Sequence, residues 1–273
     1  MAAALGCRST HAARRRLPFL RCASLLVALR SVRASSASAF DSGARPSVKA
    51  VLFDFDGSLV QSEEVHRLSF SAVLERELDH DTWYTKCVGK RPLKILQEWR
   101  HPDAPPAEEL AERLKADATG RYDQVAATVG HDQLLKDIEA AGVRKAIVSS
   151  GTRVYINRVL DNLGIADRFE LIVAGDDADV TAHKPDPQPY LLAARRMNLE
   201  PGQCVAVEDS PAGITSALRA GMRVIAVRNP ANRDDPLLKD KSVIAIVNDF
   251  TGLDRAFLMA CAPSKGADVA PSA

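Results

Sequence analysis

Six short runs of β-branched and apolar residues are spread along this sequence, and longer stretches of helical periodicity separate most of them. The runs are Val48–Phe53, Lys145–Val148, Phe169–Ala174, Cys204–Val207, Val224–Val227 and Val243–Val247. Continuous apolar runs are typical of parallel strands buried on both faces, and strands that alternate with helices form doubly wound sheets. We therefore expect an α/β fold with a doubly wound, Rossmann-like parallel sheet as its core.

Residues 64–130 interrupt this alternation. Their apolar residues recur at helical spacing, as in Val65, Leu68 and Ala72, without a strand run. We expect this segment to form an inserted α-helical cap domain. The α/β core would then consist of two pieces of the chain, 47–63 and 131–262, and residues 263–273 would form a loose tail.

The first 46 residues differ in composition from the rest of the chain. They are rich in Ser and Ala, and they contain eight of the 36 basic residues but one of the 35 acidic residues. An arginine-rich, acid-poor N-terminus is typical of an organelle transit peptide. We expect residues 1–46 to be a leader and linker that direct the protein to a plastid (chloroplast) or a mitochondrion. The alternative is a basic N-terminus of a cytosolic protein.

Without the leader, residues 47–273 contain 28 basic and 34 acidic residues. This acidic balance argues against a nucleic-acid partner. The apolar stretch 17–29 contains Arg21 and is too short for a bilayer of ~30 Å, so we expect no membrane association of the mature protein. The five cysteines lack metal-binding spacing, which predicts reduced thiols. We expect a monomer.

Four polar segments lie at the ends of the predicted strands or in the loops near them. They are Asp54-Phe-Asp-Gly57, Ser149-Ser-Gly-Thr152, Lys184-Pro-Asp-Pro187 and Glu208-Asp-Ser210. Ligands of open α/β sheets bind at the carboxyl ends of the strands. Each segment also has a structural interpretation, as a turn, a helix N-cap or a solvated charge. Two acids that end a buried strand need a cation, and Mg²⁺ prefers oxygen ligands.

In order and setting, the four segments resemble motifs I to IV of the haloacid dehalogenase superfamily. The resemblance covers residues 49–230, and the residues of the first, third and fourth segments resemble one branch in particular. That branch contains β-phosphoglucomutase, phosphoglycolate phosphatase and the sugar-phosphate phosphatases, and its small helical cap begins just after motif I. The resemblance implies a Mg²⁺-dependent phosphatase that acts on a small phosphorylated metabolite, in particular a sugar phosphate.

The resemblance also implies catalytic roles. Asp54 would attack phosphorus and form an aspartyl-phosphate. Asp56 would protonate the leaving alcohol and then activate the hydrolytic water. Ser149, Ser150 and Lys184 would bind oxygens of the phosphoryl group, and Lys184 would also offset its charge.

The same resemblance implies a magnesium site. Asp54 and Asp209 would hold Mg²⁺ through their carboxylates, and Asp56 through its backbone carbonyl. Glu208 would be either a further ligand or a support for the ligands. A cation is needed because a carboxylate nucleophile and a phosphate dianion repel each other.

Three further positions are candidates for substrate contact. His66 lies where related sugar-phosphate enzymes have a histidine, and it would orient Asp56 or the substrate. Lys90 or Arg91 would meet a sugar hydroxyl or a distal phosphate from the cap, and Arg153 would contact substrate from the core. The structural alternative is an exposed histidine at a helix start for His66, and solvated charges for Lys90 and Arg91.

Two rival functions remain open at this stage. A phosphomutase of the β-phosphoglucomutase type would share every core residue named above and would protect the phospho-enzyme from water. A non-catalytic binding protein on the same fold is the other rival, because fold does not determine function. The four charged residues Asp54, Asp56, Lys184 and Asp209 argue for an enzyme.

Overall fold

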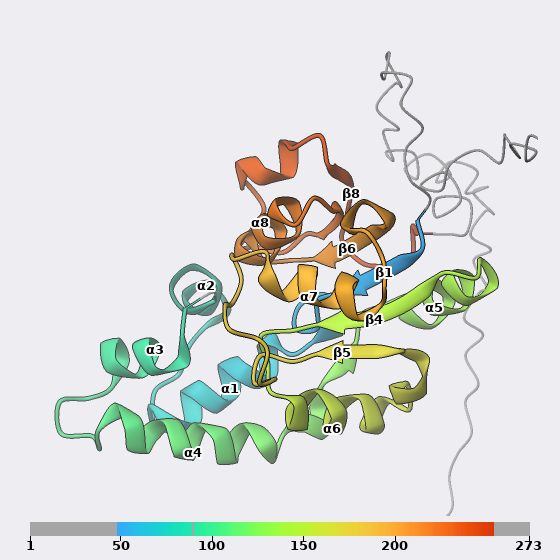
Figure 1. The fold of residues 1–273 in the computed structure, drawn as a ribbon. Coiled ribbons are helices and arrows are strands. Elements are labelled where there is room, and N and C mark those ends of the chain that lie inside the picture. The colour runs from blue at the N-terminus through green and yellow to red at the C-terminus, as the bar shows by residue number, and fades with distance from the viewer. Residues whose placement is uncertain (1–47, 89, 254–273) are drawn as a thin grey trace, which may run out of the picture. The chain divides into compact units, whose positions relative to one another are not determined.

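The computed structural model describes residues 48–88 and 90–253 (Figure 1). Six parallel strands form one sheet in the order β5-β4-β1-β6-β7-β8. Their bounds are β1 Ala50–Phe53, β4 Arg144–Val148, β5 Leu171–Val173, β6 Cys204–Glu208, β7 Arg223–Val227 and β8 Val243–Val247. Every predicted strand run forms a strand, so the predicted doubly wound α/β core is confirmed. The expected leader, the expected tail and the last residues of the expected core lie outside the described residues.

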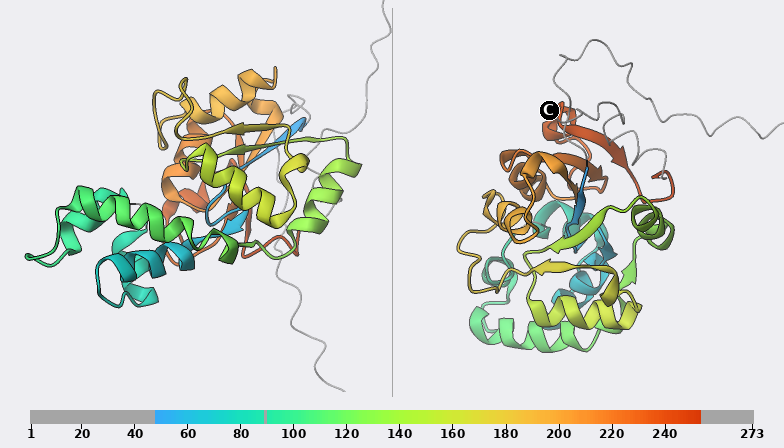
Figure 2. Two further views of the ribbon diagram at one scale, coloured as in Figure 1. Left: turned by 90° about the horizontal axis from the view of Figure 1, so that it is seen from below. Right: turned by 45° about the vertical axis from the view of Figure 1, so that its right-hand side comes forward.

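Helices cover both faces of the sheet, as the two views in Figure 2 show. One apolar cluster joins β1 to α5 (His131–Ala140) and α6 (Arg153–Leu163), and a second joins it to α7 (Gln188–Arg196) and α8 (Pro211–Arg219). Alternate residues of β1 enter the two clusters, because successive side chains of a strand point to opposite faces. This double cover explains why the central strands are apolar throughout.

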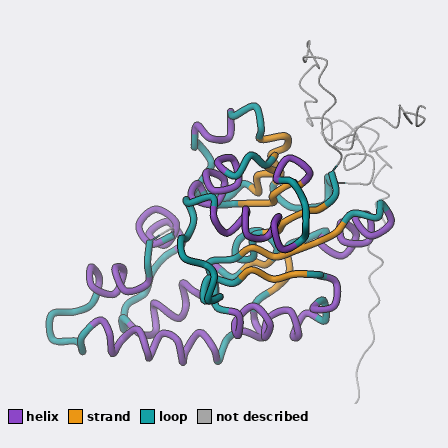
Figure 3. The backbone as a smooth tube through the Cα atoms, viewed as in Figure 1, coloured by secondary structure: helices purple, strands orange, loops and turns teal. Residues whose placement is uncertain are grey.

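The tube drawing in Figure 3 shows the alternation of strands and helices along the core. Short 3₁₀ segments lie between several of the longer elements: η2 Tyr122–Gln124, η3 Ala166–Arg168, η4 Pro201–Gln203 and η5 Pro236–Lys239. The chain moves outward from β1 in both directions, to β4 and β5 on one side and to β6, β7 and β8 on the other. Such a switch in strand order creates a crevice at the carboxyl ends of the central strands.

The segment after β1 forms a group of helices with an apolar core of its own. The elements are α1 Glu63–Val73, α2 His80–Thr82, the π-helix η1 Trp83–Cys87, α3 Pro92–Trp99 and α4 Ala107–Thr119. Their buried residues include Phe70, Trp83 and Leu110. Figure 1 shows α1, α3 and α4 gathered beside the sheet. The inserted helical cap is therefore present, and the exact limits 64–130 stay a prediction.

One expectation about the cap is wrong. We expected no strand between residues 64 and 130, but β3 (Ala126–Ala127) pairs antiparallel with β2 (Val60–Gln61). Two alanines give no detectable periodicity, and the pairing arises because the chain returns to the core beside the point where it left. The Gln61 amide also donates to the Thr128 hydroxyl at 2.8 Å. The two chain crossings between core and cap are thus tied together.

One further expectation concerns the cysteines. Cys87 and Cys204 are both buried free thiols, as predicted for reduced cysteines. Across the described ranges, no helix combines the length and the apolarity needed to cross a bilayer.

Candidate active site

Strands β1, β4 and β6 lie side by side, and their carboxyl ends bring three of the predicted segments together. Phe53, the last residue of β1, is in register with Ile147 of β4 and with Val207 of β6. The backbone N–H of Asp54 then donates to the Val207 carbonyl at 2.9 Å, which continues the ladder by one residue. Asp54 is therefore held at the edge of the sheet by the fold itself.

Lys184, from the loop between β5 and α7, connects all three strand ends. Its Nζ donates to Asp54 Oδ1 at 2.5 Å, to Glu208 Oε1 at 2.6 Å and to the carbonyl of Val148 at 2.9 Å. The side chain of Lys184 is 5% exposed, so these contacts lie in a region of low dielectric constant. In the sequence, a solvated charge was the structural alternative for this lysine, whereas the structure places Lys184 at the centre of the site.

Glu208 is fully buried and surrounded by donors. Its Oε1 accepts from Lys184 and from the Tyr190 hydroxyl at 2.8 Å, and its Oε2 accepts from the backbone N–H groups of Asp209 and Ser210 and from the Ser210 hydroxyl. Five donors leave little capacity for a metal ion. Of the two roles left open for Glu208, the geometry favours the support of Lys184 and of the loop after β6.

Residue 213 has to be glycine because the Glu208 carboxylate leaves no space for a side chain there. A Cβ at this position would lie 1.9 Å from Glu208 Oε1, far inside van der Waals contact. The close approach of the α8 backbone thus encloses the Glu208 carboxylate.

Asp209 is positioned by two asparagines that the sequence analysis did not identify. Asn229 Nδ2 donates to Asp209 Oδ2 at 2.7 Å, and Asn232 Nδ2 donates to the Asp209 carbonyl at 2.6 Å. Ser58 Oγ lies 3.3 Å from the other carboxylate oxygen. On the side of the first motif, a Cβ at Gly57 would meet Asp209 Oδ2 at 2.2 Å, so this turn needs glycine for space as well as for its φ of +80°.

The carboxylates in this site outnumber the cations. Asp54, Glu208 and Asp209 are all buried, and one oxygen of each lies within 4.8 Å of the others. Burial, and then the charge of Glu208, raises the pKa of Asp54 to about 8, although Lys184 opposes this. Burial, and then the charges of Asp54 and Glu208, raises the pKa of Asp209 well above its ordinary value. One ammonium group cannot balance the negative charge of three carboxylates. A magnesium ion would supply further positive charge, and carboxylate oxygens are ligands that Mg²⁺ prefers.

Asp56 lies two residues after Asp54 and is held separately from this cluster. The hydroxyls of Ser62 and Tyr155 both donate to its Oδ1, the former at 2.5 Å, and His66 Nε2 lies 3.7 Å from the same atom. Burial would raise the pKa of Asp56, but these three partners outweigh it and hold that pKa below its ordinary value. Asp56 is therefore oriented and kept ionised by Tyr155 of the core and by Ser62 and His66 at the start of α1. The geometry of His66 agrees with the predicted orientation of Asp56.

Tyr155 connects this group to the core. Its ring packs edge-on against Phe55, with ring centroids 5.6 Å apart, and lies 4.7 Å from the ring of Tyr122. The segment after β4 places it there: the hydroxyl of Thr152 caps α6 by accepting from the Tyr155 N–H at 3.4 Å. Thr152 is therefore the N-cap residue of α6.

Ser149 is buried at the end of β4, and its Oγ accepts from the backbone N–H of Gly151 at 2.9 Å. Its backbone N–H continues the sheet by donating to the carbonyl of Val173. Ser150 is exposed. Both residues lie at the strand end beside Lys184, and their contacts with a phosphoryl group stay predictions.

Arg153 has partners within the core that the sequence did not reveal. Its guanidinium pairs with Asp177 at 2.7 Å and also donates to the Ile172 carbonyl, so it fastens the start of α6 to the loop after β5. A substrate contact would have to compete with this ion pair. No local pattern reveals this ion pair, because the partner is 24 positions away in the sequence, and a substrate contact of Arg153 stays a prediction.

Of the two cap candidates, Lys90 is also engaged elsewhere. Its Nζ pairs with Glu98 of α3 at 2.6 Å, which explains this charge without a substrate. Arg91 is the N-cap residue of α3 and is exposed. A role for Arg91 in substrate binding stays a prediction.

Comparison with known proteins agrees with this geometry. The model of the haloacid dehalogenase-like hydrolases matches residues 51–227, which include all four motifs. The chain belongs to this family. Among its relatives is protein CbbY of Rhodobacter capsulatus, 32% identical over 69% of this chain and 88% of that protein. Hexitol phosphatase A of Escherichia coli is 33% identical over 72% of this chain and 89% of that protein.

Solved structures support the same branch of this haloacid dehalogenase-like family. A putative β-phosphoglucomutase from Thermotoga maritima has a TM-score of 0.61 and 25% identity, and the match covers 73% of this chain and 94% of that one. The predicted membership of the superfamily, and of its branch with a small helical cap, is confirmed. The chain is an enzyme of the phosphatase type.

Proposed function

We propose that this haloacid dehalogenase-like hydrolase is a Mg²⁺-dependent phosphatase that removes phosphate from a small phosphorylated metabolite, most specifically a sugar phosphate. The observation that carries the proposal is the arrangement around Lys184. Its Nζ lies 2.5 Å from the buried carboxylate of Asp54, in a cluster that contains more carboxylates than cations. Such a site suits a reaction between a carboxylate nucleophile and a phosphate dianion, because cations must offset the repulsion.

The residues present fit a magnesium ion. Asp54 and Asp209 would hold it with their carboxylates, together with the backbone carbonyl of Asp56. When bound, Mg²⁺ would neutralise negative charge on the phosphoryl group and on the two carboxylates. The excess of buried carboxylates over Lys184, and the close fit of Gly57 against Asp209, support this assignment.

The side chains divide the chemistry in two steps. In the first, an Asp54 oxygen forms a bond to phosphorus and the bond from phosphorus to the leaving oxygen breaks. Asp56, whose pKa is held low in the structure described here, has to take up a proton before this step and passes it to the leaving oxygen. In the second, Asp56 takes a proton from water, the water oxygen bonds to phosphorus, and the bond from phosphorus to Asp54 breaks. Lys184 and Ser149 bind the phosphoryl oxygens in both steps.

The phosphomutase remains the main rival, because the similar structure from T. maritima carries a β-phosphoglucomutase name. The two functions differ in the acceptor of the phosphoryl group, which is water in a phosphatase and a second sugar phosphate in a mutase. Turnover that requires a bisphosphate and releases no phosphate would favour the mutase. An inactive binding protein would show neither reaction.

The test is phosphate release by the full chain from a panel of sugar phosphates, phosphoglycolate and nucleotides, with Mg²⁺ or with EDTA. We expect release that depends on Mg²⁺ and is lost in Asp54→Asn. Release that persists in Asp54→Asn would contradict the aspartyl-phosphate, and release that persists in EDTA would contradict the metal.

We also propose that the protein acts in an organelle, on the strength of the arginine-rich, acid-poor residues 1–46. Fusion of these residues to a fluorescent protein should direct it to plastids or mitochondria of plant cells. A diffuse cytosolic signal would contradict this proposal.

A further inference from the structure

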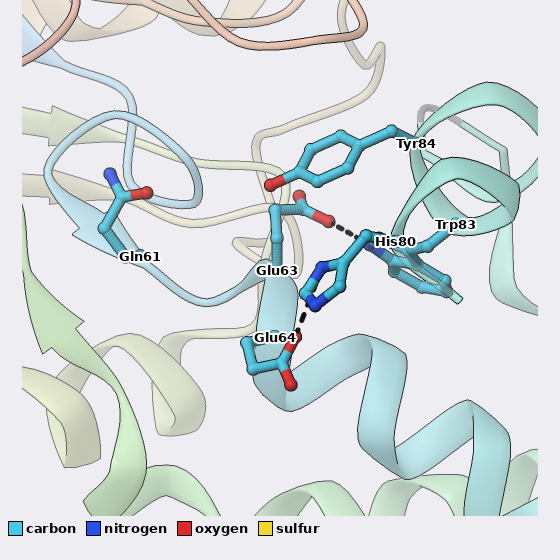
Figure 4. Close-up of a pocket in the computed structure, with 6 residues that line it drawn as sticks. All are labelled: Gln61, Glu63, Glu64, His80, Trp83 and Tyr84. Carbon is cyan, nitrogen blue, oxygen red and sulfur yellow. Dashed lines mark hydrogen bonds and ion pairs between the residues drawn. The ribbon is translucent and has the colours of Figure 1, made fainter. Parts of the chain in front are cut away.

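A pocket of about 120 Å³ lies where the start of α1 faces the segment formed by α2 and η1. Its lining residues are Gln61, Glu63, Glu64, His80, Trp83 and Tyr84 (Figure 4). A dry cavity of about 150 Å³ accommodates a molecule the size of benzene, so this pocket has room for a small organic group. Its lining combines carboxylates, an amide, an imidazole, a phenol and an indole.

The pocket adjoins the catalytic site. Ser62 lies between two lining residues, Gln61 and Glu63, and donates to the carboxylate of Asp56 at 2.5 Å. Burial raises the pKa of Tyr84, and the charges of Glu63 and Asp209 raise it further. The Tyr84 hydroxyl therefore lies in the field of the catalytic carboxylates. Because Asp56 protonates the leaving oxygen in the proposed mechanism, the remainder of the leaving group would extend toward this pocket.

Glu63 is the fixed acceptor in the pocket. The indole N–H of the buried Trp83 donates to its Oε2 at 2.7 Å, and Figure 4 shows the hydroxyl end of Tyr84 turned toward it. Glu64, at the rim, differs from Glu63 because Arg67 pairs with it at 2.6 Å and His80 lies 3.7 Å away. None of the ion pairs within residues 48–88 and 90–253 involves Glu63.

We propose that this pocket binds the hydroxyl groups of the leaving group, that Glu63 and Tyr84 determine specificity there, and that the leaving group is a small uncharged polyol. The proposal rests on the phosphatase function and narrows its substrate class. Hydroxyl groups donate strongly to a carboxylate, and a site built for such hydrogen bonds discriminates against analogues that cannot make them. A leaving group with its own phosphate or carboxylate would be repelled by Glu63.

Two basic side chains of the cap already have acidic partners of their own. Lys90, one of the residues predicted to meet a distal phosphate, is paired with Glu98. Arg67 is committed to Glu64 and to the carbonyl of Leu78. These two cations thus already serve the cap. Burial raises the pKa of Glu63, while the nearby His66, which also faces Asp56, and the Trp83 N–H oppose this rise, so Glu63 is the acidic group of the pocket that lacks an ion pair among the described residues.

The test compares two substrates that differ at one carbon atom, glucitol 6-phosphate and 6-phosphogluconate, with Mg²⁺ and the full chain. Wild type should show a kcat/KM at least about tenfold higher for glucitol 6-phosphate, because the carboxylate of 6-phosphogluconate meets Glu63. Glu63→Gln keeps an oxygen that can accept from Trp83 and removes the charge, so it should reduce this ratio at least about tenfold. Glu112→Gln, on the exposed face of α4, is the matched control and should leave the ratio unchanged.

A ratio near one in wild type, or a ratio that Glu63→Gln leaves unchanged, would overturn the proposal. A purely structural role for Glu63 would change both kcat/KM values together and not their ratio. If Glu63→Gln does not fold, Tyr84→Phe provides the second variant, with an expected loss of about three- to tenfold in kcat/KM for glucitol 6-phosphate. No loss in Tyr84→Phe would then count against the pocket.

Calorimetric titration of Asp54→Asn with the same two compounds separates this proposal from the proposed function. Tighter binding of glucitol 6-phosphate without turnover by wild type would support the pocket and contradict the phosphatase. Turnover by wild type without a binding preference would contradict the pocket alone. Failure to bind either compound, with no turnover, would overturn both.

Discussion

Tyr190 connects the buried core of this hydrolase to its chemistry, and deletion of one oxygen atom tests that connection. Its hydroxyl donates at 2.8 Å to the same Glu208 oxygen that accepts from Lys184, and both Tyr190 and Glu208 are fully buried. Tyr190→Phe removes the hydroxyl and keeps the ring in place. Glu208 then has one donor fewer, at a depth where water cannot replace it.

The size of the effect follows from the charge of the acceptor. A hydrogen bond to a charged group contributes about 1.5–3 kcal/mol to the free energy of unfolding. Since a domain of this size loses roughly 2–4 °C of Tm per kcal/mol, Tyr190→Phe should lower Tm by about 3–12 °C. We also expect kcat to fall roughly tenfold, because Glu208 helps to hold the ammonium of Lys184 beside Asp54.

Urea unfolding and thermal unfolding of the full chain measure the loss of stability, and phosphate release from the best substrate of the panel measures kcat. Tyr122→Phe is the matched control, because its hydroxyl makes no hydrogen bond to any residue of the described ranges and its ring packs against Tyr155. A free energy of unfolding for Tyr190→Phe within about 0.5 kcal/mol of the control would refute the reasoning, since changes of that size are typical of surface positions.

Three further changes test other parts of the structure. Tyr155→Phe should lower kcat about tenfold in steady-state assays, because one of the hydroxyls that hold Asp56 is lost; an unchanged kcat would show that Ser62 suffices. Mg²⁺ at about 100 times its Kd should stabilise the wild-type protein by about 2.7 kcal/mol in thermal unfolding, and Asp209→Asn should abolish this; equal stabilisation of both would place the metal elsewhere. Hydrogen bonds from Arg168 lower the folded-state pKa of Glu139 to about 2 from an ordinary value of 4.5, so its contribution to stability is present above pH 4.5 and is lost as pH falls toward 2. Glu139→Gln should therefore flatten the decline of Tm with acidity over that range, and parallel declines in both proteins would contradict the assignment.

The strands and the four catalytic motifs were predictable because their signals are local. A strand buried on both faces has to be apolar along its length, and the polar residues at its end stand out against it. The fold then brings the strand ends together, as the contacts of Lys184 with Asp54 and with Glu208 show. The carboxyl ends of parallel strands share one edge of the sheet, which is why these groups meet there.

The residues that hold these groups were not predictable in the same way. Tyr190, Asn229 and Tyr155 are ordinary residues of helices and loops, and their importance comes from partners 18, 20 and 99 positions away. The same reason explains why the ion pair of Arg153 was not predictable, since its partner Asp177 follows another strand. Long-range pairing of polar side chains leaves no periodic trace in a sequence.

The charge of the cap also bears on the choice between phosphatase and mutase. A mutase that works through a bisphosphate has to accept a second phosphate group next to the catalytic carboxylates. If the leaving group occupies the proposed pocket, such a phosphate would meet Glu63, while Lys90 is held by Glu98. The repulsion would weaken binding of a bisphosphate relative to a monophosphate with a neutral leaving group. If the pocket is confirmed, water becomes the more accessible acceptor for the phosphoryl group on Asp54, and the same carboxylate that selects the substrate also favours hydrolysis.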